Sequence, residues 1–372
     1  MVETDDGLFA VESTSKGEPP AVLFVLHQMG TLDHALALHR QITDGGGTSH
    51  FALGEPDLVL PDWFVEETRG AAIVDEPLQL IAADAYDAVV IQVPYDDLRG
   101  PEWSELDQDD AFIVYPGYAV WMVDWEHGAH GLPFFARCSL VLASSPFSRD
   151  GYLAAETRPT RAIWSGDPLM YELRTSELPE PEQTTILWAP HWAEKWVDER
   201  LGFASWKDTV HDVLKVARKN EQARFVVRGH PLMAVGDGGD ARTRRAAKSF
   251  RRLLELPNVE VSTVSMKEDI LRSSALITDG VSIIAYFGVT ERPLAVVRLG
   301  NRWPPYNAAG KALVNASDTV ASRRQLRRWL QKASRGTLPR NPETRELVAQ
   351  LFPLREESPG ARLLGALRER GN

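Results

Sequence analysis

Three segments in the second half of the chain place anion-binding side chains directly after a short apolar run. The segments are Pro190-His191-Trp192 after TILWA, Arg228-Gly229-His230-Pro231 after RFVV, and Thr278-Asp279-Gly280-Val281-Ser282 after ALI. Imidazole and guanidinium groups hydrogen-bond phosphate oxygens, and a guanidinium also neutralises their charge. If the three apolar runs are parallel strands, their polar ends meet at the carboxyl edge of one sheet. The pattern predicts a diphosphate pocket, although a lone histidine is more often a buried hydrogen-bonding residue than a catalyst.

The third segment lies within a strand-turn-helix-strand pattern that spans residues 269–298. Strands are expected at 275–277 and 294–297, with a helix at 281–287 that Gly288 ends as a C-cap. Thr278, Asp279 and Gly280 then form the turn at the helix N-terminus, where unpaired N–H groups attract phosphate. Ser282 adds a hydroxyl in the first turn. The alternative is that Asp279 and Ser282 only cap the helix.

In the first half, the segment YPGYAVWMVDWEHGAH at 115–130 is the richest in functional side chains. Aromatic rings beside acids suit the binding of a polyol or a sugar ring. The candidate acceptor-binding residues are Tyr118, Trp121, Trp125 and His27. Asp124, His127 and His27 are the candidates for a general base, which must be a carboxylate or imidazole near the reacting hydroxyl. The alternative is that these are core aromatics beside a solvated acid pair.

The distribution of charge separates the chain into two halves. Residues 1–183 carry 9 Lys and Arg against 32 Asp and Glu, whereas residues 184–372 carry 32 against 20. The basic half suits an anionic ligand such as a nucleotide diphosphate, and the acidic half repels nucleic acid. Complementary domain faces are the alternative explanation.

The order of the apolar runs indicates an α/β protein of two domains. Strands are expected at 21–26, 87–93, 111–115, 139–143 and 161–164, and then at 185–189, 224–227 and 259–261. We expect a disordered lead at 1–20, an acceptor-binding domain at 21–175 and a linker at 176–185. A nucleotide-donor domain follows at 186–355, and a last helix, within 356–372, is a candidate for crossing back to the first domain.

Composition and motifs exclude several functional classes. Apolar residues make up 44% and charged residues 25% of the chain, as in ordinary globular proteins. The N-terminus is acidic and polar, no apolar run has the ~20 residues of a membrane span, and Cys138 is the single cysteine. A cytoplasmic protein is expected. The sequence contains no HExxH, GxSxG or Walker lysine motif, so neither a metal nor a cofactor is expected.

The segments TILWAPHW, RFVVRGHP and DILRSSALITDGVSIIAYFGVTERPLAVV together resemble the CDP-glycerol glycerophosphotransferases, the family of teichoic-acid primases and polymerases. SGDPLMYEL at 165–173 resembles a further segment of that family, and the order agrees over roughly residues 111–300. The resemblance implies a GT-B fold, in which two Rossmann-like domains face each other across a cleft. It implies a CDP-linked donor, with His230 holding or protonating the diphosphate. Arg228, Thr278, Asp279, Gly280, Ser282 and His191 would line the phosphate site.

This chain also departs from the family pattern. The family places a His-Gly pair, whose histidine is the proposed base, where this chain has Pro116-Gly117. Donor chemistry is therefore better supported than polymer synthesis. We expect a transferase that moves glycerophosphate, a related polyol phosphate or a glycosyl group to a hydroxyl acceptor in cell-envelope polymer or glycan synthesis. A UDP- or GDP-sugar glycosyltransferase and a non-catalytic nucleotide-binding protein are the alternatives.

Two basic stretches, 242–252 and 323–328, suggest a peripheral contact with anionic lipid at the inner face of the cell membrane. A solvated helix face is the alternative explanation for both.

Overall fold

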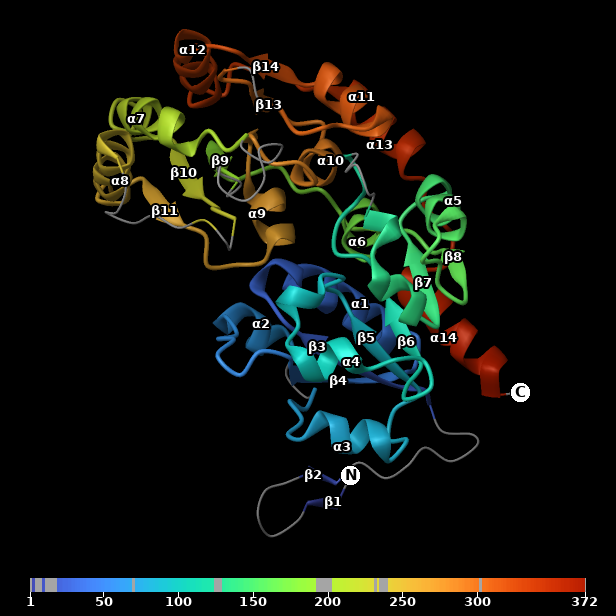
Figure 1. Ribbon diagram of the computed structural model, residues 1–372. Coiled ribbons are helices and arrows are strands. Elements are labelled where there is room, and N and C mark those ends of the chain that lie inside the picture. Colours follow the sequence, from blue (N-terminus) through green and yellow to red (C-terminus); the bar gives the residue numbers. More distant parts are fainter. Residues whose placement is uncertain are drawn as a thin grey trace. The chain divides into compact units, whose positions relative to one another are not determined.

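The computed structural model describes residues 2–3, 9–10, 19–68, 71–123, 129–191, 203–230, 233, 240–300 and 303–371. The chain divides into two compact units. Unit 1 comprises Met1–Val120, Trp125–Glu172 and Phe352–Asn372, and unit 2 comprises Trp121–Asp124 and Leu173–Leu351. Over the described residues each unit contains one six-stranded parallel sheet with helices (Figure 1). The expected α/β fold with two Rossmann-like domains is confirmed.

In the described part of unit 1, the sheet has the strand order β4-β3-β5-β6-β7-β8, and all neighbours are parallel. The strands are β3 (Ala21–Leu26), β4 (Thr48–Leu53), β5 (Ala88–Ile91), β6 (Ile113–Tyr115), β7 (Leu140–Ala143) and β8 (Ala162–Trp164). The helices are α1 (Leu32–Asp44), α2 (Asp62–Glu67), α3 (Pro77–Ala82), α4 (Pro101–Glu105), α5 (Pro146–Ala154) and α14 (Pro359–Gly371), and α6 (Pro168–Thr175) contains the boundary with unit 2. All six residues of β3 are buried, because helices cover both faces of a parallel sheet.

The last helix, α14, belongs to unit 1 and packs on α1. Leu363 and Leu364 of α14 are completely buried there. A Cβ atom on Gly45 or Gly47 would lie 2.7 Å from the Leu364 side chain, so this glycine-rich turn leaves room for a helix. The close packing of Leu364 explains Gly45 and Gly47, and the φ of 79° at Gly46 explains the glycine between them.

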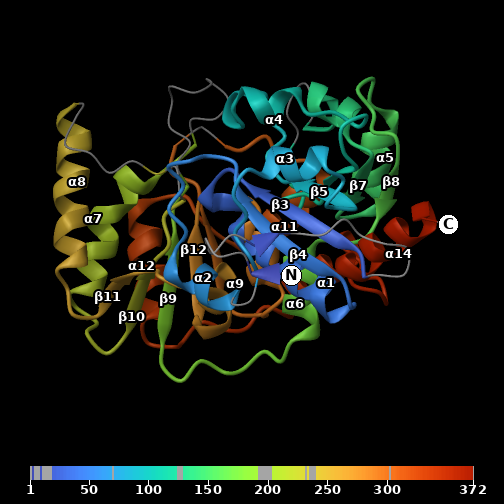
Figure 2. The same ribbon diagram turned by 90° about the horizontal axis from the view of Figure 1, so that it is seen from below.

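In the described part of unit 2, the sheet has the strand order β11-β10-β9-β12-β13-β14, again with parallel neighbours. The strands are β9 (Thr185–Ala189), β10 (Arg224–Val227), β11 (Val259–Val261), β12 (Ala275–Thr278), β13 (Leu294–Val297) and β14 (Asp318–Val320). The helices are α7 (Trp206–Ala217), α8 (Ala241–Leu254), α9 (Met266–Arg272), α10 (Ile283–Gly288), α11 (Ala308–Ala316), α12 (Arg323–Ala333) and α13 (Pro342–Leu351). Figure 2 shows α8, α7 and α12 in succession along one side of this sheet.

Several boundaries differ from the sequence-based expectations. Strands β4 and β14 are the outermost strands of their sheets and were not expected, since their sequences mix polar and apolar residues. Gly288 is not a C-cap: it is the last residue of α10, and a Cβ atom there would lie 3.2 Å from Val348 of α13. At 1–20, where disorder was expected, the described residues include a short antiparallel pair, β1 (Val2–Glu3) with β2 (Phe9–Ala10).

The two units divide between Glu172 and Leu173, earlier than the linker expected at 176–185. Within that stretch, the Pro179 carbonyl accepts a hydrogen bond from Arg292, which is 3% exposed. Arg292 also donates to the carbonyls of Ile270, Leu271 and Ser273. One buried guanidinium therefore fixes part of the expected linker to unit 2.

No helix among the described residues is both long and apolar enough to cross a membrane.

The packing of α14 on α1 leads to a stability prediction. Leu364→Ala should lower the free energy of unfolding by about 3 kcal/mol, because it leaves a cavity in a closely packed site. Urea denaturation of the full chain measures the change. Leu153→Ala on α5 is the matched control: Leu153 is 42% exposed, so the loss there should stay below about 1 kcal/mol. Equal losses in the two variants would contradict the buried position of Leu364.

Candidate functional site

The strand ends singled out in the sequence meet at one edge of the unit 2 sheet. Strand β9 lies between β10 and β12, with Val227 opposite Trp188 and Thr278 opposite Ala189. Strand β13 follows, with Val296 opposite Thr278. The residues that come directly after these four strands therefore share the carboxyl edge, which we call the donor edge. This is the edge at which open parallel sheets bind ligands.

The buried Asp279 carboxylate connects neighbouring segments of the donor edge through hydrogen bonds. Its carboxylate accepts a hydrogen bond from the His191 backbone N–H at 2.7 Å and from the Ser205 hydroxyl at 2.6 Å. The Ser205 backbone N–H donates to the same carboxylate. Burial raises the pKa of Asp279, and these hydrogen bonds offset only part of that effect. Asp279 thus ties the end of β12 to residues on both sides of 192–202, a structural role that the sequence did not reveal.

Thr278 has a similar role, and neither Asp279 nor Ser282 caps α10. The Thr278 hydroxyl donates to the Ala189 carbonyl at 2.6 Å and accepts from the Gly280 N–H at 2.8 Å, and the side chain is fully buried. Helix α10 begins at Ile283 after Ser282, which makes no side-chain capping bond. The capping alternative is therefore wrong. Because α10 has only six residues, its N-terminus alone is a weak argument for a phosphate site.

His191 and His230 lie beside each other at the donor edge. Their ring centroids are 5.0 Å apart, and the His230 backbone N–H donates to the Pro190 carbonyl at 3.1 Å. Burial lowers the pKa of His230 to about 4. Burial, followed by the charge of a protonated His230, lowers the pKa of His191 well below its usual value. Both imidazoles are therefore neutral at pH 7 and suited to donate hydrogen bonds to an anion.

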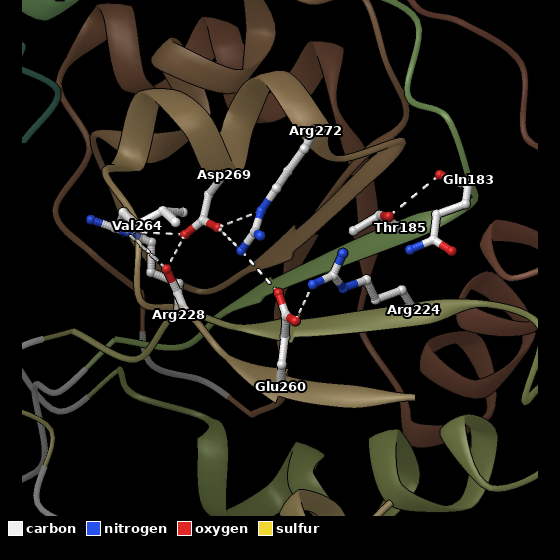
Figure 3. Close-up of polar contacts among 9 residues, drawn as sticks. Gln183, Thr185, Arg224, Arg228, Glu260, Val264, Asp269 and Arg272 are labelled. Atoms are coloured by element: carbon white, nitrogen blue, oxygen red, sulfur yellow. Dashed lines mark hydrogen bonds and ion pairs between the residues drawn. The ribbon is translucent and has the colours of Figure 1, made fainter. Parts of the chain in front are cut away.

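Arg228 is part of a network of hydrogen bonds and ion pairs beside the donor edge (Figure 3). Its Nη1 donates to Asp269 Oδ2 at 2.9 Å, to the Val264 carbonyl at 2.8 Å and to the Ser262 hydroxyl at 3.1 Å. Asp269 is completely buried and also accepts from Arg272 at 2.7 Å. Arg228 was expected to neutralise the charge of a phosphate. The buried Asp269 carboxylate already balances part of its positive charge.

Arg298, which follows β13, is a candidate that the sequence analysis missed. Among the described residues, no carboxylate forms an ion pair with Arg298, and its buried Nε lacks a hydrogen-bond acceptor. Its guanidinium carbon lies 3.0 Å from the ring centroid of Trp303. A buried donor without an acceptor indicates a ligand or a water. The available signal was its position, one residue beyond the apolar run LAVV.

Tyr306 connects Arg298 to the rest of the donor edge. Burial raises the pKa of the Tyr306 hydroxyl, the nearby carboxylate of Asp279 adds to that rise, and Arg298 opposes it. The phenol therefore lies within electrostatic reach of both residues. Arg298, Tyr306 and Asp279 form one electrostatic group at the ends of β12 and β13.

In unit 1, His27 follows β3 at the carboxyl edge of the sheet and is 4% exposed. Neither ring nitrogen has a hydrogen-bond partner among the described residues. The ring lies edge-on to Trp103, with 5.9 Å between centroids. Burial lowers the pKa of His27 to about 4, the positive charge of Arg99 lowers it further, and the backbone of Val25 offsets only part of this. A buried neutral imidazole of this kind could accept a proton from a bound hydroxyl.

The structure separates the other acceptor candidates. The Tyr118 hydroxyl lies 3.2 Å from that of Tyr95, in unit 1. Trp121 groups with unit 2 instead, where its carbonyl accepts from the Asn307 side chain at 3.2 Å. It was expected in the first domain, and the adjacent bridge between Val123 and Tyr306 explains the difference. Three further candidates lie outside the described residues: Asp124, Trp125 and His127.

No group of three or more His, Cys, Asp or Glu side chains with metal-binding geometry occurs within the part of the chain that the structure describes.

No protein-family model matches this sequence, and no curated protein matches it. Solved structures, in contrast, match nearly the whole chain. A putative UDP-N-acetylglucosamine 2-epimerase from Listeria monocytogenes aligns with a TM-score of 0.61 at 10% identity, covering 95% of this chain and 97% of that one. The wall teichoic acid polymerase TagF aligns with a TM-score of 0.60 at 14% identity, covering 95% and 89%. A UDP-GlcNAc 2-epimerase from Neisseria meningitidis, solved with UDP-GlcNAc, has a TM-score of 0.53 at 11% identity, covering 94% and 100%.

At these identities the similarity establishes the fold, which is GT-B. The resemblance to the CDP-glycerol glycerophosphotransferases is confirmed at that coarser level only, because the epimerases share the same architecture.

The role of Asp279 can be tested through stability. Asp279→Ala should lower the free energy of unfolding by about 3 kcal/mol, because it leaves the buried N–H groups of His191 and Ser205 without an acceptor. Ser205→Ala removes only the hydroxyl donor and should cost about 1 kcal/mol. Urea denaturation of both variants gives the comparison. If Asp279→Ala cost no more than Ser205→Ala, the carboxylate would not organise this edge.

The pKa of His27 leads to a pH-dependent prediction. Because the pKa falls from its usual 6.5 to about 4 on folding, the unfolded chain binds an extra proton between those values. Stability is therefore lost as the pH falls from about 6.5 to about 4, by about 3 kcal/mol for this residue. Between about pH 7 and about pH 4.5 the loss from this residue is about 2 kcal/mol, and His27→Gln should remove it in urea titrations at those two pH values. An unchanged pH dependence would show that His27 is not a buried neutral imidazole.

Proposed function

We propose that this chain is a GT-B transferase that uses a nucleotide-diphosphate donor. The favoured donor is CDP-linked, and the group transferred to a hydroxyl acceptor is glycerophosphate, a related polyol phosphate or a sugar. The observation that carries the proposal is Arg298, a guanidinium without a carboxylate partner among the described residues, at the same sheet edge as two neutral imidazoles. Cationic and neutral N–H donors at one edge suit an anionic diphosphate.

The donor edge would act on the leaving group. In transfer from a CDP-linked polyol, the acceptor oxygen bonds to the distal phosphorus, the bond from that phosphorus to the bridging oxygen breaks, and CMP departs. Arg298 would balance the charge that develops on CMP, and His230 would donate a hydrogen bond or a proton to it. A bound diphosphate raises the pKa of His230 from about 4, because a nearby negative charge favours the imidazolium. Binding of the donor would thereby favour the protonated form of His230, which can act as the general acid.

On the acceptor side, His27 is the base candidate that the structure describes. A hydroxyl bound to its unpartnered ring would lose its proton to the imidazole. Tyr95 and Tyr118 follow the neighbouring strands β5 and β6 and provide further hydroxyl groups for a polyol. Pro116 occupies the position of the family's histidine, so a base at His27 would differ from the family pattern.

The second candidate function is transfer from a UDP- or GDP-linked sugar. It is supported by the common fold of this chain and a UDP-GlcNAc 2-epimerase solved with UDP-GlcNAc, whereas a TagF structure soaked with CDPG supports the first. A thermal-shift panel of CMP, CDP, UDP and GDP distinguishes the two donors. Stabilisation by CDP above the others favours the polyol phosphate, and a preference for UDP or GDP favours the sugar.

Variants of the donor edge test the proposal directly. His230→Ala should lower turnover of the donor that binds by about 100-fold or more, because it removes a donor to the leaving group. Arg298→Ala should weaken nucleotide binding by about tenfold or more, since it removes a charge-assisted hydrogen bond. Donor turnover and isothermal titration measure the two effects.

Two exposed residues of unit 2 provide matched controls, His211→Ala on α7 and Arg335→Ala after α12, which should leave both quantities unchanged. Nucleotide binding without transfer from any donor would favour a non-catalytic binding protein. If none of the nucleotides bound, the transferase proposal would be wrong.

A further inference from the structure

Helices α7, α8 and α12 form one continuous layer on one face of the unit 2 sheet. Their buried side chains belong to a single hydrophobic core with the strands, including Val213 of α7, Leu253 of α8 and Leu330 of α12. Helix α7 packs against both of the others, and Figures 1 and 2 show α7 and α8 side by side. We call these three helices the helical layer. The side of the layer that faces the sheet is fixed by this shared core.

The helical layer is strongly cationic, although the chain as a whole has a formal charge of −11. Helix α8 carries six Lys and Arg residues and no acid, and α12 carries five and no acid. Helix α7 contributes two lysines and two aspartates. Thirteen basic residues therefore stand against two acidic ones within three helices.

Both aspartates are neutralised inside the layer. Asp212 is completely buried and accepts from Arg323 at 2.6 Å and from Arg327 at 2.8 Å. Asp208 pairs with Arg242. The buried Asp212 thus joins α12 to α7. The other cations of the layer are not neutralised by these two aspartates.

Exposed cations that form no ion pair within the described part of the chain include Arg245, Lys248 and Arg252 on α8 and Arg324 and Arg328 on α12. At about 100° per residue, the three on α8 fall within an arc of about 60°. That arc is opposite Ala246, Phe250 and Leu253, which face the core. The two on α12 are likewise opposite Leu326 and Leu330. The cations therefore point away from the sheet on both helices.

From this geometry we infer that the helical layer docks on the surface of an anionic lipid bilayer. Each Lys or Arg near such a surface adds about 1 kcal/mol of attraction, so five act strongly together. Single-stranded nucleic acid fits less well, because it stacks on exposed aromatic rings. The aromatic residues of the layer, Trp206, Phe250 and Trp329, are packed in the core instead.

Vesicle co-sedimentation of the full chain tests the inference. The protein should bind vesicles containing about 30% phosphatidylglycerol at about 0.1 M salt and should not bind pure phosphatidylcholine vesicles. The triple variant Arg245→Glu, Lys248→Glu, Arg252→Glu should bind at least about tenfold more weakly, because three attractions become repulsions. Those side chains are exposed, so the variant should keep the wild-type melting temperature.

A matched triple variant outside the layer, Arg149→Glu, Arg158→Glu, Lys311→Glu, changes the net charge by the same amount and should bind like the wild type. Equal losses in both variants would mean that net charge alone controls binding, and the inference would be wrong. It would also be wrong if the wild type ignored anionic vesicles but bound an oligothymidylate of about 30 residues through the same three cations. Nucleotide binding at the donor edge should be unchanged in both variants, so failure here is distinguishable from failure of the proposed transferase.

Discussion

The Asp279 carboxylate accepts hydrogen bonds from the His191 backbone and from both donors of Ser205, so one buried charge fixes the donor edge of unit 2. Placing a carboxylate where water is excluded is costly, as the raised pKa of Asp279 reflects, and the three donors offset that cost. The negative charge of Asp279 is hydrogen-bonded to backbone and hydroxyl donors. These bonds reduce its repulsion of the anion that is proposed to bind at this edge. Asp279 therefore shapes the edge at which an anionic ligand is proposed to bind.

Three arginines of unit 2 show how surroundings assign different roles to one residue type. Arg228 shares the buried Asp269 with Arg272, and Arg292 holds four backbone carbonyls, so both are structural in the geometry described. Arg298 has neither kind of partner among the described residues, and it stacks on Trp303 instead. A guanidinium stacked on an aromatic ring keeps its in-plane donors for an anion. This contrast, more than the number of basic residues, is the reason for proposing Arg298 as the guanidinium that faces a ligand.

The structure shows where the positive charge of the second half of the chain is located. The positive charge of the second half is concentrated in α8 and α12, which carry eleven basic residues and no acidic ones. Several of the basic residues at or near the donor edge are balanced by carboxylates, as in the network around Asp269. Unit 2 thus has two cationic features with different characters: a small group of donors at the sheet edge and a broad charged layer on helices. A small anionic ligand is proposed for the first feature and an extended anionic surface for the second.

The sequence by itself determined the parallel α/β fold, because buried strands of a parallel sheet are nearly continuous apolar runs such as AVLFVL and TILWA. It also located the polar strand ends, since the residue after a strand lies at the carboxyl edge whatever the packing. The sequence could not distinguish residues proposed to face a ligand from structural residues. Internal hydrogen bonds are made by the side chains of Thr278, Asp279 and Arg228, whereas the Nε of Arg298 has no partner among the described residues. Only the tertiary structure decides this, because hydrogen-bond partners such as Ser205 and Asp269 come from positions far away in the sequence. Strand β14 was likewise missed, because it lies at the edge of its sheet, is buried only at Val320, and therefore lacks a continuous apolar run.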